Sequence, residues 1–332
     1  LLTGEDILPF AENRNILLSF ITYLLKYPDP VYEPYEPPTK NKFSGNEDYA
    51  RSDPFTEAIN SVRGRAFQAF VNFAYQDGKQ FDKVSTVKLT ADVKQIYEDL
   101  LANEDTEALM FVVGHYIPTF YYRDADWMRI QFPLIFPLED TKKDLFIAAA
   151  EGYLSTSLYK ELFTELEFVY KRLISFRAAD YTKRRYFGEI DETLSGHIAL
   201  AYMHFDVDTT SRIFKSLWYS TPERRKHFIS FIGRHAISRD NAKKWCEEQG
   251  VNIEKLKVLW DWVLNTWRTS EVFSDFGFWI NTEKEIFEIE WLANRAKRTL
   301  EKSKGVLDWE YGMMKSMHDF IRVAPEDALA ML

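Results

Sequence analysis

Two histidines and two aspartates in the middle of the sequence have the types and spacing of a metal-binding cluster. His197 and His204 are seven residues apart in a segment with helical periodicity, which places both on one face of a helix, and Asp206 and Asp208 follow directly. Imidazole and carboxylate ligands suit hard or borderline cations, so the cluster could serve a metal-dependent hydrolase. Alternatively, Asp206 and Asp208 are the polar residues expected between one helix end and the next N-cap. We favour this structural interpretation and expect no cofactor.

Other catalytic patterns are missing from the sequence. It contains no phosphate-binding G-x-x-x-x-G-K-[ST], no dinucleotide-binding G-x-G-x-x-G, no G-x-S-x-G and no H-E-x-x-H. The single cysteine, Cys246, excludes a disulfide framework and Cys-rich zinc sites, and it has no neighbouring histidine that would activate it. We therefore expect a packed thiol and a chain without enzymatic activity.

Charged and aromatic residues instead suggest protein recognition. The formal net charge of −9 disfavours binding to a nucleic-acid backbone, yet residues 222–244 hold seven Lys or Arg and two acidic residues. This basic segment could dock an acidic partner, or it could be a solvated helix face. Tyrosines in a proline-rich loop could anchor an interface or hold the loop on the helices beneath. The candidate protein-binding residues are Tyr32, Tyr35, Arg63, Arg65, Arg224, Arg225 and Arg234.

The elements that carry these residues are predicted to be helices. Glycine and proline are scarce, at 13 and 12 residues, and apolar residues recur at helical spacing. A first helix is expected at about 13–27, followed by a long loop to residue 53 and a helix at 55–75. Gly64 lies inside this last helix and is costly there unless another backbone approaches it.

Capping residues and periodicity predict the remaining helices. Thr90 is a plausible N-cap for a helix at 91–103, and Asp105 or Thr106 for one at 107–122, while Pro222 suits the first turn of a helix. Further helices are expected at 140–155, 159–176, 190–205, 209–219, 220–238, 253–267, 283–300 and 306–321.

Helices of this length joined by short loops predict an all-α fold. A spacing of about 40 residues per helix pair is near that of HEAT units, so we expect a right-handed α-solenoid of HEAT- or TPR-like hairpins, with a globular all-α domain as the alternative. Residues 1–53 would form an N-terminal helix with a Pro- and Tyr-rich loop. Residues 54–332 would form one continuous helical-repeat array.

Several segments, in order, resemble a known group of proteins: AINSVRGRAFQAFV, EALMFVVGHYIPTFYYRDADWMRIQFPLIFP, AAAEGYLSTSLYKELFTELEFVYKRLI and TPERRKHFISFIGRHA. From about residue 54 to the end, the chain resembles the C-terminal helical-repeat region of large bacterial anti-phage defence proteins. Those proteins carry an N-terminal effector, often a nuclease or a SIR2-type NADase, and in many cases a central STAND NTPase. Their C-terminal repeats sense phage proteins.

The resemblance implies a partner and a cellular context for the chain. It implies a phage protein such as a terminase, portal or tail component as partner, contacts with other domains of the parent protein, a possible homo-oligomer, and no catalytic residue. The apolar residues 16–25 are too few for the roughly 20 that a membrane span needs. Because the sequence also starts without Met or a signal peptide, we expect a fragment of a longer cytoplasmic protein.

Overall fold

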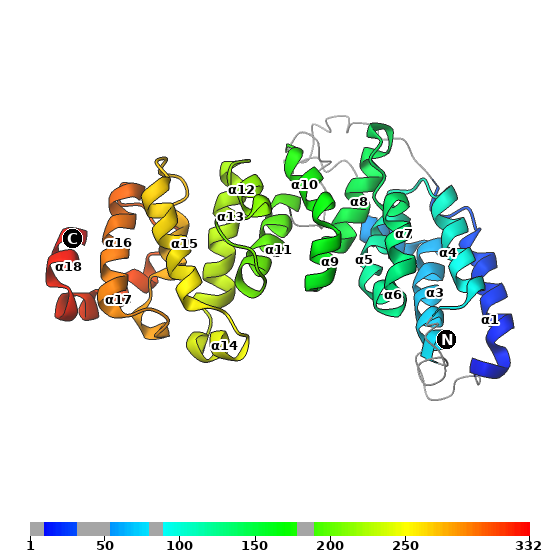
Figure 1. Ribbon diagram of the computed structural model, residues 1–332, viewed down its shortest axis with the longest axis horizontal. Helices are drawn as coiled ribbons and strands as arrows, with labels where there is room; N and C mark the ends of the chain where they lie inside the picture. Colours follow the sequence, from blue (N-terminus) through cyan, green and yellow to red (C-terminus); the bar gives the residue numbers. More distant parts are fainter. Residues whose placement is uncertain (1–9, 32–53, 80–88, 178–188) are drawn as a thin grey trace, which may run out of the picture. The chain divides into compact units, whose positions relative to one another are not determined.

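The computed structural model describes residues 10–31, 54–79, 89–177 and 189–332, and in these residues the regular structure consists of helices without a strand (Figure 1). The predicted all-α fold is confirmed. Among the same residues no helix combines the length and apolar character needed to cross a membrane. Tyr32, Tyr35 and most of the predicted proline-rich loop lie outside the described residues.

The chain divides into two compact units. The first comprises Leu1–Glu165 and Phe176–Gly188, and the second Leu166–Ser175 and Glu189–Leu332. This division differs from the predicted boundary between residues 53 and 54. The N-terminal helix belongs to the first unit because its Leu18, Ile21 and Leu25 are buried where it packs along a helix from beyond residue 53.

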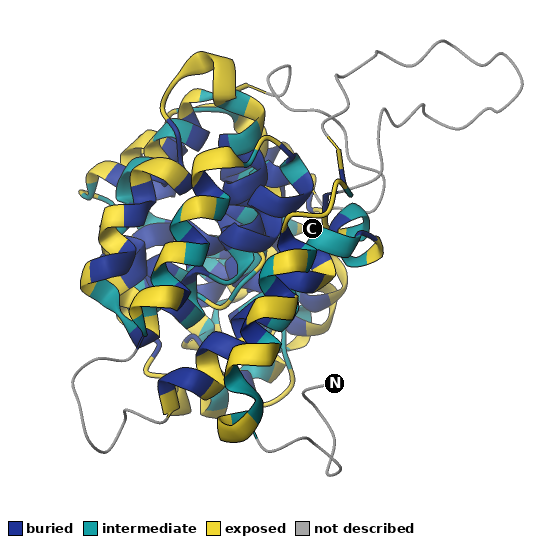
Figure 2. Ribbon diagram, turned by 90° about the vertical axis from the view of Figure 1, so that its right-hand side faces the viewer, coloured by how far each residue is buried: buried dark blue, intermediate teal, exposed yellow. Residues whose placement is uncertain are grey.

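The helices of the first unit are α1 (Phe10–Leu25), α2 (Pro54–Asn60), α3 (Val62–Lys79), α4 (Ala91–Asn103), α5 (Glu107–His115), α6 (Ile117–Arg123), α7 (Ala125–Ile135), the 3₁₀ helix η1 (Asp140–Lys142), α8 (Lys143–Leu154) and α9 (Lys160–Glu165). Most of the outer helices carry both buried and exposed positions, as the colours of Figure 2 show, whereas residues 146–154 of α8 are all buried. α1 packs along α3, α2 packs on α5, and α4 packs on α7.

The centre of the first unit is the close contact between α5 and α8. Gly114 of α5 lies against the backbone carbonyl of Ala149, and Gly152 of α8 lies against that of Phe111. A side chain at either glycine would overlap the facing carbonyl. The glycines therefore allow two buried helices to approach through their backbones.

The predicted helix at 55–75 is two helices, α2 and α3, which meet at Ser61. Gly64 lies where a Cβ atom would overlap the Ala58 carbonyl, which is the backbone approach that a glycine in this position requires. Thr106 caps α5 as predicted, since its hydroxyl accepts from the Leu109 amide. Thr90 precedes α4 as predicted, but its side chain makes no capping bond.

The helices of the second unit are α10 (Glu167–Ser175), α11 (Ile190–His204), α12 (Arg212–Trp218), α13 (Pro222–Ile232), the π-helical turn η3 (Gly233–Ile237), α14 (Ala242–Glu248), α15 (Ile253–Thr266), the 3₁₀ helices η4 (Ser274–Trp279) and η5 (Thr282–Lys284), α16 (Ile289–Ser303), α17 (Tyr311–Val323) and α18 (Pro325–Met331). Its core is aromatic. Trp260 and Trp279 are fully buried with ring centroids 5.5 Å apart, and their indole N–H groups donate to Thr299 Oγ1 and the Ile229 carbonyl.

Candidate protein-binding groove

The four residues predicted as a possible metal cluster do not form one. His197 is buried with its Nδ1 3.0 Å from the Tyr170 hydroxyl, whereas the ring of His204 packs against Trp245. Asp208 accepts hydrogen bonds from residues 210 and 211 of its own turn. Within the described ranges no group of three or more His, Cys, Asp or Glu residues could hold a metal ion, so the structural interpretation of these residues is the better one.

Arg224 and Arg225 do not offer a docking surface, contrary to the prediction from the basic segment. Arg224 is fully buried and donates to Asp191 Oδ1 at 2.8 Å and to the Ile174 carbonyl at 2.6 Å. Arg225 donates to the Trp218 carbonyl at 2.9 Å, and its guanidinium lies 4.4 Å from the ring centroid of a tryptophan. Both guanidinium groups are bound within the second unit and are not available to a partner. A buried guanidinium is tolerated only when it has such hydrogen-bond partners.

The other predicted binding residues differ in exposure. Arg234 is half-exposed and lies 3.5 Å from Glu192. Arg65 is exposed and makes only a long 3.4 Å contact with Gln68. Arg63 is mostly buried in the first unit, at one end of a surface groove.

This groove lies between α1 and α4 of the first unit. The inner face of α1 packs on α3, and α4 packs on α7, so part of the facing surfaces of α1 and α4 stays uncovered. On α4, Ile96 and Leu100 are only half-buried, although they are four residues apart on one helix face. Two partly exposed helix faces thus run beside each other.

Ion pairs close the groove at both ends. At the N-terminal ends of the two helices, Arg14 donates to both oxygens of Asp77 at 2.7 and 2.8 Å and to both oxygens of Asp92 at 2.9 and 3.0 Å. These hydrogen bonds lower the pKa of Asp92 to about 2. At the C-terminal ends, Arg63 donates to both oxygens of Glu104 at 3.2 and 3.3 Å. Arg14 thus joins α1 to both α3 and α4, and Arg63 joins α3 to the residue that follows α4.

The groove consists of two adjoining hollows of about 350 and 550 Å³. The first is closest to Arg63 and the second lies along the middle of α1. Their walls combine apolar and polar side chains. The first is lined by Thr22, Leu25, Lys26, Arg63, Ile96, Asp99, Leu100, Asn103 and Glu104, and the second by Asn15, Leu18, Ser19, Thr22, Tyr23, Lys26 and Ile96.

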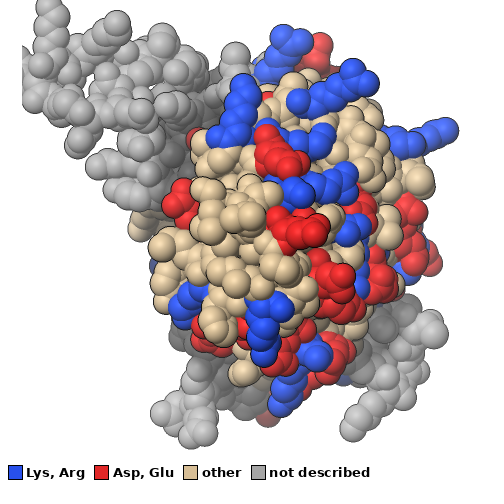
Figure 3. All heavy atoms as spheres, turned by 90° about the vertical axis from the view of Figure 1, so that its left-hand side faces the viewer, with Lys and Arg blue, Asp and Glu red and all other residues tan. Residues whose placement is uncertain are grey.

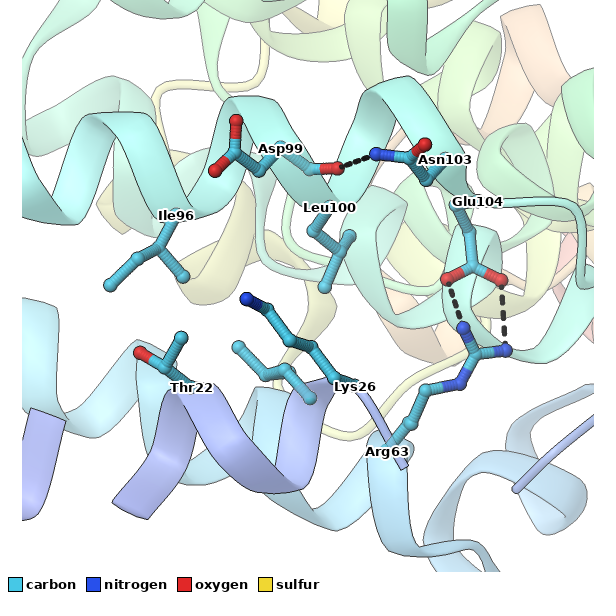
Figure 4. A pocket seen from close by; sticks show the side chains of 9 residues that line it. Thr22, Lys26, Arg63, Ile96, Asp99, Leu100, Asn103 and Glu104 are labelled. Carbon is cyan, nitrogen blue, oxygen red and sulfur yellow. Dashed lines mark hydrogen bonds and ion pairs between the residues drawn. The ribbon is translucent and has the colours of Figure 1, made fainter. Parts of the chain in front are cut away.

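The charged side chains of the groove differ in how fully their polar atoms are hydrogen-bonded. Burial raises the pKa of Glu104, although a hydrogen bond from Thr106 and the charge of Arg63 partly oppose this. The Nε–H of Arg63 is buried without an acceptor. Figure 4 shows the ammonium of Lys26 extending into the space bounded by Thr22, Ile96 and Leu100.

Of the residues that line the groove, only Arg63 was predicted from the sequence as a binding residue. The signal available for α4 was the spacing of Ile96, Leu100 and Asn103 on one face, which indicates an amphipathic helix and not which part of that face stays open. The position of Lys26 beside α4 depends on contacts between residues far apart in the sequence.

Comparisons of the chain with known protein families, curated proteins and solved structures gave no match. The resemblance to the repeat region of anti-phage defence proteins therefore stays a prediction.

Proposed function

We propose that the chain is a non-enzymatic recognition domain, the sensor region of a bacterial anti-phage defence protein that acts in the cytoplasm. It binds a phage structural or packaging protein, such as a terminase, portal or tail component. Binding favours one of two states of the parent protein and so triggers an effector elsewhere in it, to the extent that the ligand prefers that state.

The observation that carries this proposal is the groove between α1 and α4. Its lining mixes apolar and polar side chains, as is typical of recognition sites, and its volume and open side suit a protein segment. Exposed apolar side chains lie beside it. Tyr23, which lines the second hollow, is 68% exposed, and Phe20 of α1 is 55% exposed; such aromatic residues commonly anchor protein interfaces.

The finer architecture is also a proposal. We infer a right-handed α-solenoid of HEAT- or TPR-like hairpins, because helices pack on near neighbours in the sequence: α2 on α3, α11 on α13, and α16 on both α17 and α18. Stacked repeats bury their apolar faces in this way. A solved structure whose hairpins follow one another with a constant right-handed rotation will confirm it.

The functional proposal is tested by mixing the purified chain with individual structural and packaging proteins of a phage. We expect one of them to be captured, with an affinity measurable by calorimetry. Capture of none across several phages that the parent protein restricts will disprove the sensor role.

A second candidate is a scaffold that mediates oligomerisation of its parent. Tyr311, Met314 and Ile321 lie on one face of α17 and are 57%, 70% and 55% exposed. Figure 3 shows a broad uncharged area beside acidic and basic side chains on the side of the second unit that carries the C-terminal helices. Sedimentation equilibrium distinguishes this role: a scaffold will self-associate without phage protein, and Met314→Lys will weaken the association.

A further inference from the structure

We propose that the groove between α1 and α4 binds an amphipathic helix of the partner protein, and that an acidic side chain of this helix pairs with Lys26. The inference rests on the recognition function proposed above and specifies its site and the chemistry of the partner segment.

The walls of the groove select a helix over an extended peptide. Both walls are α-helices, whose backbone groups are already hydrogen-bonded within α1 and α4, so a partner strand finds no free sheet edge. Contact must come from side chains. The groove floor offers Leu18, Ile96 and Leu100, which match the apolar face of a helix with residues at i, i+3, i+4 and i+7.

The length of the groove fits a short helical segment. The lining of α1 extends from Asn15 to Lys26, which corresponds to about 17 Å at 1.5 Å per residue. Since the ion pairs of Arg14 and Arg63 close the two ends, the partner helix contributes about three turns.

Lys26 determines the charge of the partner. Three other polar side chains of the groove donate within their own helices: Ser19 to the Asn15 carbonyl, Thr22 to the Leu18 carbonyl, and Asn103 to the Asp99 carbonyl. Asp99 itself accepts a hydrogen bond from Gln95 at 2.8 Å.

The ammonium of Lys26, in contrast, has no hydrogen-bond or ion-pair partner among the described residues and relies on water. A helix that covers the groove removes this water. Burying an unpaired ammonium is costly, so a partner with a carboxylate at this position binds better than one without.

The test uses a display library of peptides of about twelve residues, the length of three helical turns, with apolar residues at helical spacing and the other positions randomised. Selection on the full chain is expected to enrich peptides with Asp or Glu at one fixed offset from the apolar residues. Fluorescence anisotropy then measures the affinity of an enriched peptide for each variant.

Lys26→Glu is expected to weaken binding about tenfold or more, and exchange of the peptide's acidic residue for Lys is expected to restore binding to this variant. Lys142→Glu, an exposed lysine on η1 outside the groove, is the matched control and leaves the affinity unchanged. Thermal melting of each variant checks that it is folded.

Several results overturn the inference. These are no enrichment, enrichment without an acidic residue, equal losses for Lys26→Glu and Lys142→Glu, or a mass measurement showing that a second copy of the chain fills the groove. If Lys26→Glu leaves capture of a phage protein intact, the groove assignment fails and the recognition function stands. If peptides are selected as expected but no phage protein is captured, the groove stands and the phage-sensing function fails.

Discussion

Replacing Arg224 with leucine is expected to destabilise the second unit, not to remove a contact with a partner. The guanidinium of Arg224 joins Asp191 to the C-terminal end of α10, where the Ile174 carbonyl accepts its hydrogen bond. Carbonyls in the last turn of a helix have no partner within that helix. Leucine has no donor, so the Arg224→Leu variant leaves a carboxylate and a buried carbonyl without their hydrogen bonds.

The magnitude follows from the burial of the pair. Removing one member of a buried ion pair costs about 3–5 kcal/mol. Because the side chain of Asp191 is 16% exposed and can be partly hydrated, we expect the lower end, about 3 kcal/mol. In a unit of roughly 150 residues each 1 kcal/mol lowers Tm by about 2–4 °C, so the Tm of Arg224→Leu should fall by about 10 °C.

Differential scanning calorimetry measures this shift, with Arg234→Leu as the matched control. Arg234 is half-exposed and its ion pair with Glu192 is 3.5 Å long. Exposed pairs contribute about 0–1 kcal/mol, so the control should melt within about 4 °C of the unsubstituted chain. Equal Tm values for the two variants would refute the structural role. If Arg224→Leu also weakened partner capture without lowering Tm, Arg224 would be the docking residue that the basic segment predicts.

Three further outcomes are expected. Gly114→Ala will lower Tm in thermal circular dichroism, because its methyl group overlaps the Ala149 carbonyl and overpacking costs about 1–3 kcal/mol; an unchanged Tm would contradict the close α5–α8 contact. Burial, with the nearby Asp308, raises the pKa of Asp275 from 3.8 to about 8, so the folded state keeps a proton that the unfolded chain has released. The free energy of unfolding should therefore fall between about pH 4 and pH 8, and urea titrations should show a smaller fall in Asp275→Asn. Burial raises the pKa of the Cys246 thiol to about 11, so a thiol reagent near neutral pH should react only after unfolding, and rapid reaction of the folded chain would show that the thiol is accessible.

The sequence predicted where several helices begin but not where tertiary contacts interrupt them. Thr106 and Pro222 begin helices as expected, because caps and first-turn prolines act locally. Thr90 also precedes its helix, but its hydroxyl donates to Asp77 of α3, a contact that no local pattern reveals. The expected helix at 107–122 divides at Tyr116, where Pro118 lies in the first turn of α6 and was the overlooked signal.

The two buried arginines were wrongly predicted to lie on a binding surface, because the prediction relied on their charge and not on their position along the helix. Arg224 and Arg225 are four residues before Phe228 and Ile229, so the helical period places all four on the same face of α13. Phe228 and Ile229 are fully buried, and that face is the inner one. The helical period therefore already indicates that both arginines are buried. Only the hydrogen-bond partners of their guanidinium groups could not be predicted from the sequence.

Whether a charged side chain is already bound within the chain also explains why Lys26 is a better candidate for binding than the predicted arginines, and why it was harder to predict. Most charged groups considered above already join helices of the chain: Arg14 reaches an aspartate 78 positions away, and Arg63 a glutamate 41 positions away. The first contact joins α1 to α4, the second joins α3 to the residue that follows α4, and Lys26 lines the groove between α1 and α4. A side chain of a type that often anchors interfaces is available to a partner only if it is not already bound within the chain. No spacing within α1 indicates that Lys26, the residue that follows this helix, lines a groove formed with α4.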